Sequence, residues 1–275
     1  MDHEVDHMSK FEAIYNRKSV RDYSPKSLPK EELSAIKDKI DDLDPLYKNI
    51  DWDILLAEEG KKVQTTFSGL TSKFAKVEAP HYLIGTSETR KGHLVNTGFL
   101  LENLVLYLTD REIGTCWIGA GINEDLLDDI YDLKYDLVIM VAFGDSVEGK
   151  SNLRKDPSEA KRKSLDELVI NDMEEMQEPW KDILKTVRIA PSAVNSQPWR
   201  FFYEDDEIHV YIEKGGMFKK LMGKIGDLDR LNHIDVGIAL KHLEIGALYH
   251  SKDIRFLDQE RKKSGYEYII SARLE

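Results

Sequence analysis

The sequence predicts an α+β protein made of two tandem half-repeats, each with a central sheet packed by long helices. Short apolar stretches typical of strands alternate with long apolar stretches of helical periodicity, a combination that favours sheets covered by helices. The order helix, break, strand, long helix, strand occurs twice in the 275 residues, and the two long helical stretches end similarly, at Arg-Glu-Ile-Gly114 and Leu-Glu-Ile-Gly246. We therefore infer a diverged internal duplication, with residues 1–170 as the first half and residues 171–275 as the second.

The first half begins with helical signals. Ser9 and Glu12 have the spacing of a capping box, so a helix should start near Ser9, and Pro29 suits the start of a second helix. Further patterns predict strands over residues 52–58, 82–86 and 137–143, and helices over residues 65–75, 93–111 and 123–131, the last capped by Asn123. Residues 145–164 are polar and lack apolar periodicity, which predicts an extended arm.

The second half repeats this organisation. A helix should follow Pro179, and the chain then breaks at Ala190-Pro191-Ser192 because proline disfavours helical backbone before it. Strands are expected over residues 199–203 and 208–212 around an Asp205-Asp206 turn, followed by a long helix over 231–249 and strands over 254–257 and 266–272.

Two histidines and one tryptophan of the second half could carry chemistry. His209 alternates with apolar residues in a predicted strand, and His233 opens the long helix together with Asp235. Neither histidine has partners at metal-ligand spacing, so we expect surface or capping roles and no metal site. Trp199 either stacks on a ligand or anchors the core, and the sequence leaves both interpretations open.

Composition excludes several classes of protein. The formal net charge of -12 disfavours nucleic acid and membrane partners, which are polyanionic. The N-terminal residues lack the basic and apolar regions of a signal peptide, and the most apolar stretch, residues 99–108, is too short to span a bilayer, so we expect a soluble, cytoplasmic protein. The single cysteine, Cys116, excludes an intramolecular disulfide and a multi-thiolate zinc site, and we expect it to be a core residue without a catalytic role.

Two motifs concentrate groups that can bind a ligand. Arg17-Lys18-Ser19-Val20-Arg21 places three cations and a hydroxyl directly after a predicted helix, which suits phosphate binding, although a solvated basic turn is an alternative interpretation. In Ala190 to Trp199, two prolines restrict the backbone while four polar side chains, Ser192, Asn195, Ser196 and Gln197, supply donors and acceptors. The second motif is too rich in polar groups for a simple turn.

Together the two motifs resemble those of the nitroreductase family, which has an Arg-x-Ser-x-Arg type motif and an Ala-Pro-Ser-x-x-Asn-x-Gln-Pro-Trp motif. The latter is matched at every specified position by residues 190–199. The resemblance implies a nitroreductase-like fold and an FMN cofactor. It also implies that the Gly-Thr-Cys-Trp-Ile-Gly stretch ending at Gly119 lies against the flavin, with a backbone N–H near Ile118 or Gly119 in contact with it, and that Arg162 reaches the phosphate.

The distribution of these motifs departs from that of ordinary family members, which carry both in one subunit and form homodimers. Here the first half has Asp44-Pro45-Leu46 where the Ala-Pro-Ser element would stand, and the second half has acidic residues where the Arg-Ser element would stand. The resemblance therefore implies a fused, monomeric pseudo-dimer with one FMN site between the halves. The expected cofactor-binding residues are Arg17, Lys18, Ser19, Arg21, Ile118, Gly119 and Arg162 from the first half, and Pro191, Ser192, Ala193 and Asn195 from the second.

The implied chemistry is that of a flavin-dependent oxidoreductase. NADH or NADPH would deliver hydride to FMN, and a small-molecule electron acceptor such as a nitroaromatic or a quinone would then be reduced. Because the cofactor performs the redox step, no acid-base dyad is expected. A non-catalytic flavin carrier or sensor, a degenerate interaction scaffold, and a different flavin reaction such as dehydrogenation or reductive dehalogenation are the alternatives. Residues 214–229 are expected to cover the flavin face.

Overall fold

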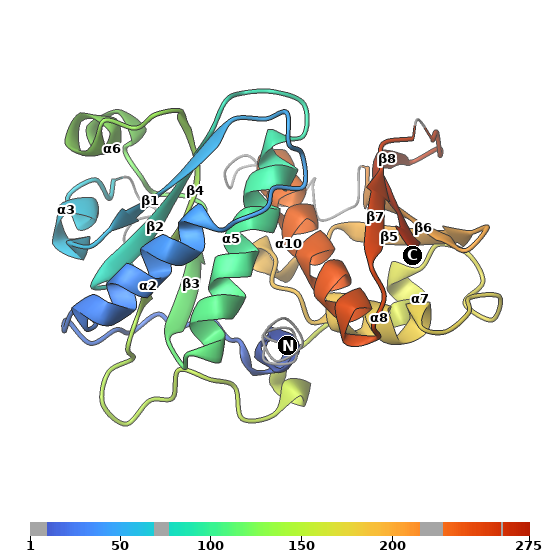
Figure 1. Ribbon diagram of the computed structural model, residues 1–275, viewed down its shortest axis with the longest axis horizontal. Coiled ribbons are helices and arrows are strands. Elements are labelled where there is room, and N and C mark those ends of the chain that lie inside the picture. The colour runs from blue at the N-terminus through green and yellow to red at the C-terminus, as the bar shows by residue number, and fades with distance from the viewer. Residues whose placement is uncertain (1–9, 69–76, 215–227, 260) are drawn as a thin grey trace. The chain divides into compact units, whose positions relative to one another are not determined.

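The computed structural model describes residues 10–68, 77–214, 228–259 and 261–275, which form two compact units (Figure 1). The first unit is Asn16–Asp156, and the second unit joins Pro157–Glu275 to the described part of Met1–Tyr15. The N-terminal helix covers residues 10–16, and Phe11 stacks on Tyr249 of the second unit with ring centroids 3.6 Å apart. The predicted capping residue, Ser9, lies outside the described residues. The division at residue 170 stays a prediction about the repeat.

The first unit is built on a four-stranded antiparallel sheet with the order β1-β2-β4-β3. Its strands are β1 (Trp52–Ala57), β2 (His81–Ser87), β3 (Gly114–Ile118) and β4 (Asp136–Gly144), and its helices are α2 (Lys30–Asp41), α3 (Gly60–Gln64), α5 (His93–Asp110) and α6 (Glu124–Tyr131). The buried helix α5 packs on the sheet, close enough that a Cβ added to Gly85 would lie 2.8 Å from Leu101 Cδ1. A core cluster that includes Tyr82 and Met140 of the sheet also contains Val63 of α3 and Leu127 of α6.

Most predicted elements of the first unit are confirmed. Asn123 caps α6 by accepting a hydrogen bond from the backbone N–H of Leu126 at 3.1 Å. The helix predicted over residues 65–75 is wrong at its start, because residues 65–68 form a turn and an isolated bridge after α3, and the remainder from residue 69 lies outside the described residues. Strand β3 was not predicted, because its five residues follow α5 closely and have no alternation of their own.

The second unit contains a second four-stranded antiparallel sheet, with the order β5-β6-β8-β7. Its strands are β5 (Trp199–Glu204), β6 (Glu207–Glu213), β7 (Ile254–Leu257) and β8 (Tyr266–Leu274), and its helices are η1 (Pro157–Glu159), α7 (Leu165–Leu168), α8 (Trp180–Arg188), η2 (Ala193–Asn195) and α10 (Leu228–Tyr249). The long helix α10 packs tightly against α8, since a Cβ added to Gly246 would lie 2.8 Å from Thr186 Oγ1.

The two sheets support the predicted half-repeats more strongly than the sequence does. Both have the same strand order, and in both the long helix connects the second strand to the third, as β2-α5-β3 and β6-α10-β7. The resemblance between the two helix ends, in contrast, is not a structural equivalence. Gly114 is the first residue of β3, whereas Gly246 lies inside α10. The α+β fold with one helix-covered sheet in each half is thus confirmed, and the matching Glu-Ile-Gly letters are coincidental.

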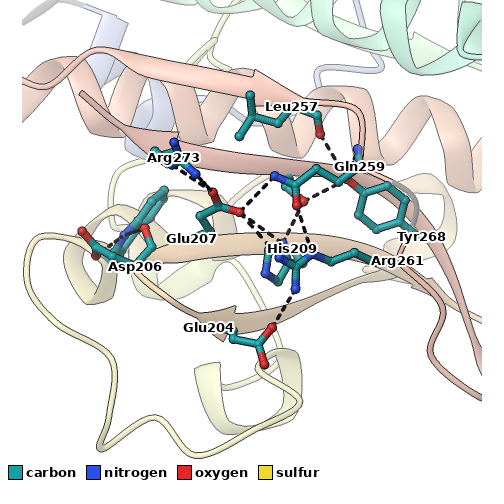
Figure 2. Close-up of polar contacts among 11 residues, drawn as sticks. Glu204, Asp206, Glu207, His209, Leu257, Gln259, Arg261, Tyr268 and Arg273 are labelled. Atoms are coloured by element: carbon teal, nitrogen blue, oxygen red, sulfur yellow. Dashed lines mark hydrogen bonds and ion pairs between the residues drawn. The ribbon is translucent and has the colours of Figure 1, made fainter.

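His209 corrects one prediction, because it is fully buried instead of lying at the surface. Its Nδ1 lies 2.7 Å from Ser271 Oγ on the neighbouring strand β8, and Ser271 Oγ in turn lies 2.8 Å from the hydroxyl of Tyr268. Figure 2 shows that His209 and Tyr268 adjoin a second set of contacts around Glu207, which involves Gln259, Arg261 and Arg273. The side chains of Gln259 and Arg261 therefore lie beside His209, and the sequence of β6 alone cannot reveal these neighbours.

The buried carboxylate of Glu207 should contribute measurably to stability. It accepts hydrogen bonds from Arg273 Nε at 2.9 Å and from Gln259 Nε2 at 3.3 Å, and it is only 3% exposed. Replacement of Glu207 by alanine should lower the free energy of unfolding by about 2 kcal/mol, because the hydrogen bonds that its buried carboxylate accepts from Arg273 and Gln259 are then lost. Glu204, an exposed partner of Arg261, is the control, and Glu204→Ala should cost less than about 1 kcal/mol in urea unfolding. Equal losses in the two variants would contradict this assignment.

Candidate functional site

The Arg17-Lys18-Ser19-Val20-Arg21 segment runs beside β3 in the first unit. Arg17 forms an antiparallel bridge with Leu153, Ser19 forms a parallel bridge with Thr115, and the backbone N–H of Val20 donates to Thr115 O at 2.9 Å. The segment is therefore paired backbone and not a free basic turn. Lys18 and Ser19 are half-buried, and Arg21 is exposed.

Arg17 is the unusual member of this segment, because its guanidinium is buried at 3% exposure. Its Nε and Nη1 atoms have no hydrogen-bond partner among the described residues. Burial lowers the pKa of Arg17, and the charge of Glu102 on α5 acts in the opposite direction. Burying a cation whose donors lack acceptors costs free energy unless a bound anion neutralises the charge and accepts the hydrogen bonds. Arg17 therefore has the properties of a ligand-binding group.

Strand β3 carries the next predicted residues. Ile118, its last residue, is 5% exposed, and Gly119 directly after it is exposed, so backbone becomes accessible at this strand end. Cys116, two residues earlier, is buried. Burial raises the pKa of the Cys116 thiol, although the charges of Arg21 and Arg17 oppose this. Its burial agrees with the expectation of a core cysteine, and a raised pKa disfavours the reactive thiolate.

In the second unit, the Ala190 to Trp199 motif forms a loop in a demanding backbone conformation. Val194, Asn195 and Gln197 have positive φ angles of 47°, 58° and 48°. Such angles are uncommon outside glycine and are least favourable for a β-branched residue such as Val194. Within the loop, the backbone N–H of Gln197 donates to Ser192 Oγ at 2.9 Å, which closes the loop on itself. Trp199 is fully buried at the start of β5, so it anchors the core.

Arg162 lies against this loop in the second unit. Its Nε donates to Ala190 O at 3.1 Å, its Nη2 to Ile189 O at 3.2 Å, and its Nη1 to Asn195 Oδ1 at 2.8 Å. The Nδ2 atom of Asn195 in turn donates a hydrogen bond to the backbone oxygen of Lys161, the residue before Arg162, at 3.0 Å. Arg162, which the family resemblance assigns to phosphate binding, thus holds the end of the arm (residues 145–164) to the loop.

The neighbouring Lys163 fastens the loop further along. Its backbone N–H donates to Gln197 Oε1 at 2.8 Å, and its Nζ donates to Ser196 O at 3.1 Å. Burial lowers the pKa of Lys163, and the nearby charge of Arg200 acts in the same direction. Lys163, Arg200 and Glu213 also line an open polar pocket of about 360 Å³, in which Arg200 pairs with Glu213 at 2.5 Å.

Asp235 of α10 contacts the 190–199 loop, and the sequence did not reveal this contact. It was expected to open the long helix, but α10 spans Leu228–Tyr249, so Asp235 is its eighth residue, and it is only 4% exposed. Both of its carboxylate oxygens accept the backbone N–H of Ala193, at 3.1 and 3.0 Å. Burial raises the pKa of Asp235 well above its ordinary value, and the hydrogen bond from Ala193 opposes the rise. An aspartate between the apolar residues Ile234 and Val236 was the available signal.

The structure therefore assembles the predicted residues as two groups, one inside each unit. Arg17, Lys18, Ser19, Arg21, Ile118 and Gly119 belong to the first unit, and Arg162, Pro191, Ser192, Ala193 and Asn195 belong to the second. The segment expected over residues 214–229 to cover the flavin lies largely outside the described residues. In the part of the chain that the structure describes, no cluster of acidic, histidine or cysteine side chains could hold a metal ion, and no helix is long and apolar enough to cross a bilayer.

Fold and motifs together define an α+β protein of the nitroreductase class. A family model described as "Putative TM nitroreductase" matches residues 10–247, and the chain belongs to this family. A comparison with curated proteins finds no match.

Solved structures that the chain resembles include one described as a "putative nitroreductase" from Thermotoga maritima, with 26% identity and a TM-score of 0.60, covering 98% of this chain and 94% of that chain. Another is a nitroreductase family protein from Clostridium novyi, with 21% identity and a TM-score of 0.43, covering 54% of this chain and 89% of that chain. The FMN-dependent nitroreductase NfnB from Mycobacterium smegmatis, solved in complex with NADPH, has 15% identity and a TM-score of 0.42, covering 58% of this chain and 99% of that chain.

Proposed function

We propose that the protein is an FMN-dependent oxidoreductase of the nitroreductase type, with one FMN bound by residues of both units. Family membership supports a nitroreductase-like oxidoreductase. The observation that carries the FMN assignment is Arg17, a buried guanidinium whose Nε and Nη1 atoms have no partner among the described residues. A phosphate would supply the missing acceptors and the missing negative charge, with the Ser19 hydroxyl and the Lys18 and Arg21 charges nearby in sequence.

The other predicted residues have distinct parts in this proposal. The accessible backbone at Ile118 and Gly119 would contact the isoalloxazine, and Pro191, Ser192, Ala193 and Asn195 are the cofactor-binding residues that we propose in the second unit. Ala193 would contribute atoms other than its N–H, because Asp235 accepts that hydrogen bond. Arg162 would serve the site chiefly by holding the loop, because its Nε, Nη1 and Nη2 donate to Ala190, Asn195 and Ile189.

The chain's own residues would bind and orient the cofactor and leave one flavin face open to substrates. When bound, FMN supplies hydride chemistry between NADH or NADPH and a small-molecule acceptor such as a nitroaromatic or a quinone. A side-chain acid-base pair is then unnecessary. Because one chain carries both motif groups, we propose that it acts as a monomeric pseudo-dimer.

Visible absorption of the purified protein tests this proposal. We expect a yellow protein, or one that becomes yellow on reconstitution with FMN, whose flavin absorption is bleached by NADH or NADPH in the absence of oxygen. Flavin that binds but is not bleached by either nucleotide would contradict the enzyme and support a carrier or sensor. A colourless protein that does not take up FMN would contradict the flavin site and support an interaction scaffold.

A further inference from the structure

The loop over residues 190–198 cannot owe its shape to local preference. Three of its non-glycine residues, Val194, Asn195 and Gln197, adopt left-handed backbone. Left-handed backbone at such residues persists only where surrounding contacts enforce it, and it is often found where a protein prepares a binding site. The Val194 side chain is 53% exposed, so burial of that side chain does not compensate for the strain. The contacts that enforce the conformation of Val194 must therefore come from the residues around it.

Asp235 provides a contact to the backbone directly before the first strained residue. Its carboxylate is buried and accepts the N–H of Ala193, the residue directly before Val194, with both oxygens. Asp235 lies on the buried length of α10, a helix of 22 residues, so its position is fixed by the core and not by the loop. A carboxylate is a costly side chain to bury, and this one directs its acceptors at a loop backbone 42 residues earlier in the sequence.

Arg162 fastens the same loop through other atoms. It binds the carbonyl groups of Ile189 and Ala190, before the strained residues, and the side chain of Asn195 among them. The loop is therefore held by hydrogen bonds to two residues, Asp235 as an acceptor on α10 and Arg162 as a donor at the end of the arm. Of the two, only Asp235 holds the backbone immediately before Val194.

We propose that Asp235 is a positioning residue for the flavin site. By holding the Ala193 N–H, it keeps residues 191–195 in the conformation that binds FMN, without touching the flavin itself. This inference rests on the proposed function for its consequence, because the loop must contact FMN for its shape to matter. The positioning of the loop by Asp235 is a separate step that holds in the flavin-free protein and can be measured there.

Two substitutions of the full-length protein separate the hydrogen bond from other effects of Asp235. Asp235→Leu removes the acceptor, and we expect at least tenfold weaker FMN binding in a fluorescence titration. Asp235→Asn keeps an amide oxygen that can accept the Ala193 N–H, and we expect an FMN affinity within threefold of the unaltered protein. Asp166→Asn, which removes an exposed negative charge in the same unit, is the matched control and should leave FMN affinity unchanged.

Hydrogen exchange of the flavin-free proteins supplies the second measurement. Amides of residues 193–197 should exchange at least tenfold faster in Asp235→Leu than in the unaltered protein, while those of β5 and β6 keep their protection, which shows that the unit remains folded. Unchanged exchange in Asp235→Leu would overturn the proposal, and so would an Asn variant that loses as much FMN affinity as the Leu variant. If the unaltered protein does not bind FMN, the proposed function fails, whereas the exchange result still decides whether Asp235 positions the loop.

Discussion

Replacement of Arg17 by methionine should weaken FMN binding about a hundredfold and, in the flavin-free protein, raise stability. The two effects have the same origin, because Nε and Nη1 of the buried guanidinium have no partner among the described residues. With a phosphate present, each atom would make a charge-assisted hydrogen bond of about 1.5–3 kcal/mol, so losing both is enough for the hundredfold change. Without a ligand, the unused donors are a cost of about 1–3 kcal/mol that methionine removes.

Fluorescence titration with FMN and urea unfolding without it measure the two parts of this prediction. The charge of Glu102 acts on Arg17, so the double variant Arg17→Met with Glu102→Gln should show whether an uncompensated Glu102 offsets the stability gain. Lys26→Met removes an exposed cation nine residues later in the sequence and should change neither quantity. A flavin-free Arg17→Met protein that is less stable in both backgrounds, with unchanged FMN affinity, would make Arg17 a structural residue.

Elements with strong periodicity could be predicted from the sequence, and short ones beside other elements could not. The long helix α5 and the strands β4 and β6 follow the expected ranges closely, because each has a clear apolar pattern. Strand β3 has five residues and takes its structure from pairing with β4, which lies more than twenty residues later. Pairing of this kind depends on the tertiary fold, so the local pattern of apolar residues does not predict this strand.

The candidate site shows the same division. The motif over residues 190–199 could be identified from its residues, because its prolines and polar side chains follow one another in the sequence. What holds the motif could not be identified, since Asp235 and Arg162 reach it across 42 and 28 residues. His209 was misjudged for the same physical reason. The groups that surround it come from β8 and from the segment around Gln259, so burial was decided by strands that its own alternation does not specify.

Acidification should destabilise the first unit through His81. This side chain is fully buried, and its two nitrogens have fixed partners: Nε2 accepts the backbone N–H of Leu28 at 2.9 Å, so Nδ1 carries the proton and donates to Glu58 O at 2.8 Å. Burial lowers the pKa of His81, with Glu58 opposing. Protonation would break the bond from Leu28, so the native state resists it and the unfolded state does not.

The sign of the effect follows from this difference in proton uptake. Above the unfolded pKa of about 6.5 both states are neutral at His81 and pH has no effect through it. Below that value the unfolded state gains a proton first, so stability falls by up to about 1.4 kcal/mol per pH unit until the lowered native pKa is reached. His209, whose pKa is also lowered by burial, acts with the same sign in the second unit.

Native-state hydrogen exchange of the Leu28 amide, compared between pH 6.5 and 5.5 after correction for intrinsic exchange, measures this loss within the first unit. The unaltered protein should lose protection at Leu28 as the pH falls, and His81→Gln, although less stable throughout, should lose less per pH unit because it has no imidazole to protonate. His209→Gln is the matched control, and it should leave the pH dependence at Leu28 as it is in the unaltered protein. A His81→Gln variant with the full slope would assign the acid sensitivity of this unit to its carboxylates instead.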